Sequence, residues 1–164
     1  MVSLIVMVRI AIFHLFLLAA LVYALRKGGG PERAMALILI AMSASDLVLH
    51  QFVPPRFTSL DSGHLAIDIA AAAATFLLAL TAYRFWPMMA AALQFLPLLA
   101  HLSRAVNVEI QPAAYLTMQV GPSWLLPPLL ALATWRHQGR VRTNGSDRSW
   151  YVSWRRSTPR TANK

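Results

Sequence analysis

Four side chains that can bind a metal ion or carry a proton lie in two pairs near apolar stretches of this sequence. Asp46 and His50 are four residues apart, as are His64 and Asp68, so each pair shares one face of a helix. Ionisable groups inside a membrane are costly, so they turn toward neighbouring helices and pair there. Because imidazole and carboxylate groups together suit a divalent metal, the candidate ligands are His50, His64, Asp46 and Asp68.

Three further polar residues lie at similar depth in neighbouring apolar runs, namely Arg9, His101 and Gln119. Arg9 matches Asp46 in depth and has the opposite charge, so we expect these two to pair, with Asp68 as a further partner. Several roles remain open for this polar cluster. It could fix the register of the helices, bind a metal, relay protons, or hold haem through His50 and His101. No diagnostic motif decides among these, so the sequence assigns no cofactor.

Helix-breaking residues mark the last apolar run, at Gly121, Pro122, Pro127 and Pro128. Each proline lacks a backbone N–H and clashes with the carbonyl four residues earlier. In lipid the freed carbonyls must face protein or a water-filled cavity, and transporters use broken helices of this kind to hold substrates. The sequence therefore predicts a broken helix, either as a structural kink or as part of a binding site.

The C-terminal segment 136–164 is polar and holds eight of the fifteen Lys and Arg residues. Its basic and aromatic residues with a predicted binding role are Arg148, Trp150, Trp154, Arg155 and Arg156. A tethered segment of this composition favours anionic lipid head groups, with a partner subunit as the alternative. No nucleic-acid-binding motif is present, so we expect no nucleic acid among the partners.

Five apolar runs must position these residues, over 2–25, 34–53, 64–82, 87–103 and 112–135. About 20 helical residues cross a hydrocarbon core of about 30 Å. We therefore predict an all-α, five-transmembrane-helix bundle over residues 1–135 and a basic cytoplasmic tail over 136–164. The alanine run at 70–74 favours close helix packing, which indicates a central position for the third helix.

Composition agrees with a membrane protein, because 57% of the residues are hydrophobic and only 13% are charged. Soluble domains carry about 25% charged residues. The absence of cysteine excludes disulfides, thiolate metal sites and cysteine nucleophiles. The first apolar run lacks a basic start and a small-residue cleavage site, so we expect it to be retained rather than removed as a signal peptide.

Lys and Arg are distributed unevenly between the two predicted sides of the membrane. Twelve lie on the side of the first connection, the turn at 83–87 and the tail, whereas Arg56 and Arg104 lie on the other side. The remaining one, Arg9, is inside the first run. The positive-inside rule then predicts an external N-terminus and a cytoplasmic C-terminus in a bacterial inner membrane. The polar cluster falls in the outer half of the bundle.

Two segments carry a resemblance to a known group of proteins. RKGGGPERA at 26–34 and RFWPMMAAALQFLPLLAHLSR at 84–104 resemble segments of uncharacterised small multi-pass bacterial inner-membrane proteins. The resemblance covers the first four runs and not the tail. It implies a bacterial inner membrane and brings no function and no site residues.

The short connections leave no room for a soluble catalytic domain, so the sequence favours a non-enzymatic protein. The first hypothesis is an accessory or scaffold subunit of a larger membrane complex, with lipid and other membrane subunits as partners. The second is a small transporter or proton-coupled channel that uses the polar site in the outer half. The third is a haem- or metal-binding redox protein of the membrane.

Overall fold

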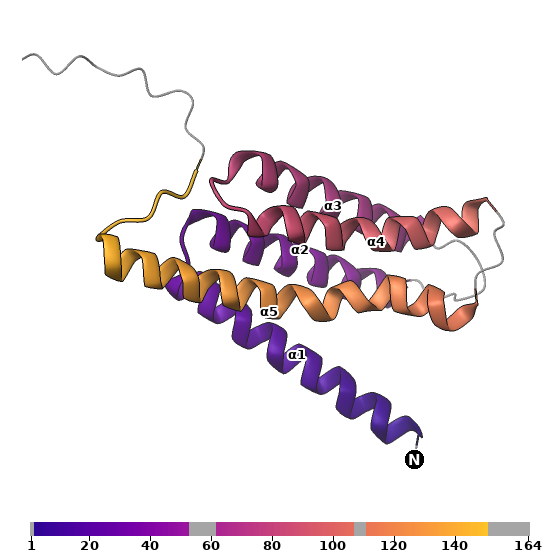
Figure 1. Cartoon of the computed structure of the whole chain (residues 1–164). Coiled ribbons are helices and arrows are strands. Elements are labelled where there is room, and N and C mark those ends of the chain that lie inside the picture. The colour runs from indigo at the N-terminus through magenta and orange to yellow at the C-terminus, as the bar shows by residue number, and fades with distance from the viewer. Residues whose placement is uncertain (1, 53–61, 107–110, 151–164) are drawn as a thin grey trace, which may run out of the picture.

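The chain folds into a helical bundle, shown in Figure 1 as a computed structural model that describes residues 2–52, 62–106 and 111–150. The described residues form five helices, namely α1 (Val2–Lys27), α2 (Gly30–Phe52), α3 (Ser62–Thr81), α4 (Trp86–Ala105) and α5 (Pro112–Asn144). Three of them hold segments long and apolar enough to cross a membrane, at Met7–Lys27, Gly30–Gln51 and Ser62–Thr81. The predicted all-helical class and the membrane character are confirmed to this extent.

Glycine and proline set the boundary between α1 and α2. The N–H of Gly28 donates to the carbonyl of Ala24 at 2.8 Å and closes the last turn of α1. Pro31 occupies the first turn of α2, where its missing N–H is not needed. The Glu32 carboxylate accepts a hydrogen bond from the N–H of Gly29 at 3.1 Å, so it caps the start of α2. The two helices therefore reverse direction in very few residues.

The helices lie lengthwise beside one another, except that α1 diverges from the others toward its N-terminus (Figure 1). α3 packs mainly on α2 and α4, whereas α5 contacts α4, α1 and, to a smaller extent, α2. The expectation of a central third helix is therefore wrong, since α5 has more neighbours. The alanines of α3 still act as expected, because Ala71 and Ala72 are buried and their size permits close helix contact.

The apolar core occupies the half of the bundle near the α1–α2 turn. Its largest members are Leu17, Leu21, Met35, Leu39, Leu78, Leu126 and Leu130. The outer surface is also apolar, with Leu15 70% and Leu80 63% exposed. Large apolar side chains over the whole surface of a bundle are expected when its surroundings are lipid tails rather than water.

The chain turns back after α5 and crosses the end of the bundle. Gly145 adopts the left-handed conformation (φ 71°), and its N–H donates to the carbonyl of Val141 at 2.9 Å, which ends α5. We call residues 145–150 the strap. The carbonyl of Ser149 accepts a hydrogen bond from the N–H of Tyr83 at 3.1 Å, which joins the strap to the α3–α4 turn. α5 itself continues to Asn144, past the predicted end of the fifth span at 135. The boundary between membrane bundle and tail stays a prediction.

Candidate functional site

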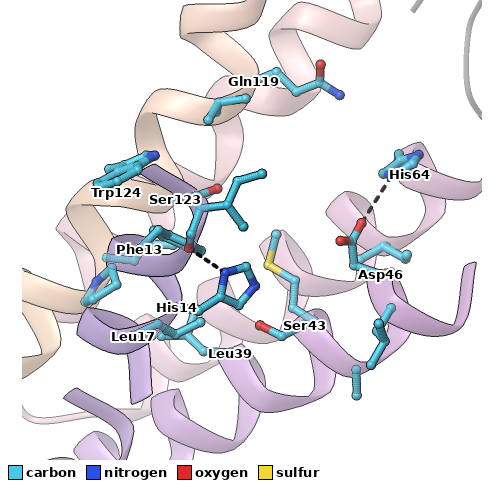
Figure 2. Close-up of a pocket in the computed structure, with 18 of the residues that line it drawn as sticks. Phe13, His14, Leu17, Leu39, Ser43, Asp46, His64, Gln119, Ser123 and Trp124 are labelled. Atoms are coloured by element: carbon cyan, nitrogen blue, oxygen red, sulfur yellow. Dashed lines mark hydrogen bonds and ion pairs between the residues drawn. The ribbon is translucent and has the colours of Figure 1, made fainter. Parts of the chain in front are cut away.

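A pocket of about 820 Å³ lies between α1, α2, α3 and α5, away from the α1–α2 turn (Figure 2). Its polar lining residues are Arg9, His14, Ser43, Asp46, His50, His64, Asp68, Gln119 and Ser123. Its apolar floor includes Leu17, Leu39 and Leu126, which also belong to the core. The pocket is therefore polar toward one end of the bundle and closed by the core toward the other.

The pocket exists because α1 packs on α5 and leaves α2. The rings of Phe13 on α1 and Trp124 on α5 lie 5.1 Å apart between centroids and hold these two helices together (Figure 2). Such aromatic pairs add to the stabilisation that burial provides. The divergence of α1 then opens a space that side chains of α2 and α3 line from the opposite wall.

Three of the four predicted metal ligands come together at this pocket. Oδ1 of Asp46 lies 3.1 Å from Nε2 of His64 and 3.6 Å from Nδ1 of His50. The two imidazole rings are 5.1 Å apart between centroids. One potential ligand atom from each of the three residues lies within 4.8 Å of the others. The spacing that places Asp46 and His50 on one helix face thus also brings them to His64 on the next helix.

The fourth predicted ligand, Asp68, pairs elsewhere. Its Oδ2 lies 3.1 Å from Nε2 of His101, and the side chains are 11% and 2% exposed respectively. This pair joins α3 to α4. Asp68 lines the pocket, whereas His101 does not. His50 and His101 therefore do not face this pocket together, and the predicted axial haem pair has no support in the geometry.

Arg9 and Gln119 both line the pocket, but the predicted pair of Arg9 with Asp46 is not formed. In the described part of the chain Asp46 has the imidazoles of His50 and His64 as its ionic partners, and Arg9 has no ion pair. The similar depth of Arg9 and Asp46 along their helices did not bring them together, because α1 diverges and carries Arg9 away from α2.

The last helix is not unwound at its prolines, and the predicted kink at this point stays a prediction. α5 runs as one helix from Pro112 to Asn144, with Pro122, Pro127 and Pro128 inside it. Neighbouring helices can support a helix through the missing hydrogen bonds of a proline, and α5 packs on α1 and α4 here. The segment still contributes to the pocket, since Ser123 and Pro127 line it, whereas Gly121 does not.

A second polar cluster, which sequence reasoning did not find, lies at the strap. Asp147 forms ion pairs with Arg84, with His137 at 2.5 Å and with Arg140 at 3.0 Å. Burial by itself would raise the pKa of Asp147. Hydrogen bonds from His137 and Arg140, with the positive charge of Arg84, outweigh that effect and hold the pKa below its usual value. The glycine at 145, a frequent helix C-cap, was the sequence signal that could have indicated the turn.

The predicted tail residues are only partly within the described chain. The guanidinium of Arg148 lies 5.2 Å from the centroid of the Tyr83 ring. Trp150 pairs with Ala82 through an isolated β-bridge and packs at Gly30. Trp154, Arg155 and Arg156 lie outside the described residues. Binding of the tail to lipid or to a partner therefore stays a prediction, but Trp150 already has a position within the bundle.

Comparison with protein-family models, curated proteins and solved structures finds no match for this chain. The resemblance of residues 26–34 and 84–104 to small bacterial membrane proteins therefore rests on those motifs alone, and the function must be inferred from the pocket.

Proposed function

We propose that this protein crosses a bacterial inner membrane with all five helices and that its polar pocket binds a small polar or ionic solute from the outer side. α4 and α5 accompany the three apolar helices along the bundle (Figure 1). α4 has 20 residues, about 30 Å of helix, which is sufficient to cross a hydrocarbon core. The excess of Lys and Arg at the end that carries the strap favours a cytoplasmic location for that end.

One observation carries the binding function, namely a pocket of about 820 Å³ with polar groups at one end and the core at the other. Small-molecule sites typically measure about 300–1,000 Å³ and combine an apolar lining with a few polar groups. Leu17, Leu39 and Leu126 close the pocket toward the strap. Access from the outer side alone would correspond to one state of an alternating-access transporter, which is the function class we favour.

The absence of cysteine permits a direct test with single-cysteine variants. Ser43 lines the pocket, whereas Ser45, two residues further along α2, is exposed outside it. A charged, membrane-impermeant thiol reagent added to intact spheroplasts should label Ser43→Cys rapidly and Ser45→Cys slowly, because thiols that face lipid do not ionise. Equal labelling, or faster labelling of Ser45→Cys, would contradict a water-accessible pocket.

The proposed orientation has a separate test. Green fluorescent protein fused after Lys164 should fluoresce, and alkaline phosphatase fused at the same point should be inactive, if the C-terminus is cytoplasmic. The opposite result would place the strap outside and overturn both the orientation and the side from which the pocket opens.

An accessory role in a larger complex is the second candidate, and the divergence of α1 favours it. The part of α1 that leaves the bundle exposes Leu4 and Met7 at 66% and 65%. A partner helix would fit beside this segment. A photo-crosslinking residue at Met7 should then capture a protein, whereas one at Leu80 of α3, which is 63% exposed, should not. Capture of lipid alone at both positions would reject the accessory role.

A further inference from the structure

The mouth of the pocket brings together one carboxylate and two imidazoles from two helices. Asp46 and His50 come from α2, one turn apart, and His64 comes from the first turn of α3. Their potential ligand atoms lie within 4.8 Å of one another. Three donors that are each about 2.1 Å from one ion can be at most about 4.2 Å apart, so small side-chain rotations would complete a site.

We propose that Asp46, His50 and His64 bind a divalent transition-metal ion of the zinc class at the mouth of the pocket. The inference rests on the proposed function, because it names a ligand for the same pocket. Three protein ligands leave at least one coordination position for water or solute. The site is open, since the side chains of Asp46, His50 and His64 are 49%, 36% and 21% exposed.

The donor set determines the class of metal. Two imidazoles with one carboxylate suit zinc and its neighbours in the first transition row, whereas Mg²⁺ and Ca²⁺ prefer sites made of oxygen ligands. Among the described residues, the charged lining also admits a cation, because it holds the carboxylates of Asp46 and Asp68 and one guanidinium, that of Arg9. His14, the remaining titratable group of the lining, hydrogen-bonds within its own helix.

His14 provides a matched control for His50. Nδ1 of His14 lies 2.8 Å from the carbonyl of Ile10, and Nδ1 of His50 lies 2.8 Å from the carbonyl of Asp46. Both rings line the pocket. Only His50 has a carboxylate and a second imidazole beside it, so His14 has the local geometry without the metal-binding neighbours.

The test uses the full chain, purified in detergent without a polyhistidine tag and titrated with ZnCl₂ in a calorimeter. We expect one Zn²⁺ per chain, with affinity lower by at least about tenfold in His50→Gln, His64→Gln and Asp46→Asn, and unchanged in His14→Gln. Co²⁺ should give the visible absorption bands of tetrahedral coordination, and Mg²⁺ and Ca²⁺ should not bind. Gel filtration and thermal unfolding of each variant show that it is folded.

Absence of Zn²⁺ binding to the wild-type chain would overturn the metal site, as would equal losses in His14→Gln and His50→Gln. Labelling of Ser43→Cys separates this failure from failure of the proposed function. Labelling at Ser43→Cys without Zn²⁺ binding would support the water-accessible pocket and reject the metal site. Zn²⁺ binding through these three residues without labelling at Ser43→Cys would support the metal site and reject the water-filled pocket.

Discussion

The two ends of the helix bundle use aspartate and histidine in opposite ways. At the strap, Asp147 has two arginines and a histidine around it, and its side chain is 5% exposed. At the pocket, the ionic partners of Asp46 within the described chain are two imidazoles, and its side chain is 49% exposed. Asp147 is enclosed and paired with two arginines that keep their charge, so it holds chain segments together. Asp46 is open and lies beside imidazoles that can lose their proton, so it remains able to bind a ligand.

The difference arises from how closely the backbone segments approach at each end. A Cβ added at Gly29 would lie 2.8 Å from Cε1 of His137, and one added at Gly30 would lie 2.5 Å from Nε1 of Trp150. The glycines therefore let α5 and the strap pack directly on the α1–α2 turn. At the pocket, the contact of Phe13 with Trp124 keeps α1 on α5 and away from α2. Close packing of backbone segments therefore closes the strap end of the bundle, whereas the contact of Phe13 with Trp124 keeps the pocket end open.

The largest expected effect comes from removing the aspartate of the strap cluster. In Asp147→Ala the guanidinium of Arg84, which is only 9% exposed, loses its carboxylate partner. Breaking a buried pair in this way costs about 3 kcal/mol, so the free energy of unfolding should fall by about that amount. Asp46→Ala removes an exposed group and should cost less than about 1 kcal/mol. Unfolding by SDS titration measures both, and a larger loss in Asp46→Ala would reverse the comparison.

The strap should also release on acidification. The pKa of Asp147 in the folded chain lies below its usual value of 3.8, so the ionised carboxylate stabilises the fold fully above about pH 4. That stabilisation is lost as the pH falls through the folded pKa. The free-energy difference between wild type and Asp147→Asn should therefore shrink as the pH falls below about pH 4. A difference that grows on acidification would contradict the lowered pKa.

A smaller effect is expected where the strap meets the first turn. Gly30→Ala places a methyl group against the indole of Trp150, which is 37% exposed and can move aside. We expect a loss of about 1 kcal/mol and faster tryptic cleavage after Arg148. In a Trp150→Ala background the same change should cost almost nothing, because the clash is absent. Equal losses in both backgrounds would show that Trp150 does not pack at Gly30.

The fold was largely predictable because the backbone of a membrane segment must satisfy its own hydrogen bonds, so long apolar runs indicate helices. Gly28 and Pro31, which stand where α1 ends and α2 begins, are residues typical of such boundaries. α5 was predicted less well, because proline weakens a helix locally while neighbouring helices decide whether it continues. The sequence alone does not show which helices pack against α5.

The candidate site was predictable in part for a related reason. A spacing of four residues places Asp46 and His50 on one helix face whatever the rest of the fold does, and these two do meet His64. The pairing of Asp68 with His101, instead of with the metal candidates, depends on how α3 rotates against α4. The position of Arg9 depends on the direction of α1. The contacts of the strap were not predicted, because a segment rich in basic and aromatic residues is also typical of a lipid-binding tail.

The smallest expected effect concerns Arg9, the one arginine of the pocket lining. A double-mutant cycle of Arg9→Ala and Asp46→Ala should give a coupling free energy below about 0.5 kcal/mol, because the two side chains form no ion pair. The cycle of Asp68→Asn and His101→Gln is the control and should give at least about 1 kcal/mol, since that pair is buried. Strong coupling of Arg9 to Asp46 would mean that an arginine neutralises this carboxylate, as arginines do at Asp147. The pocket end would then be closed by the same kind of ion pair as the strap end, and Asp46 would no longer be available to a metal ion.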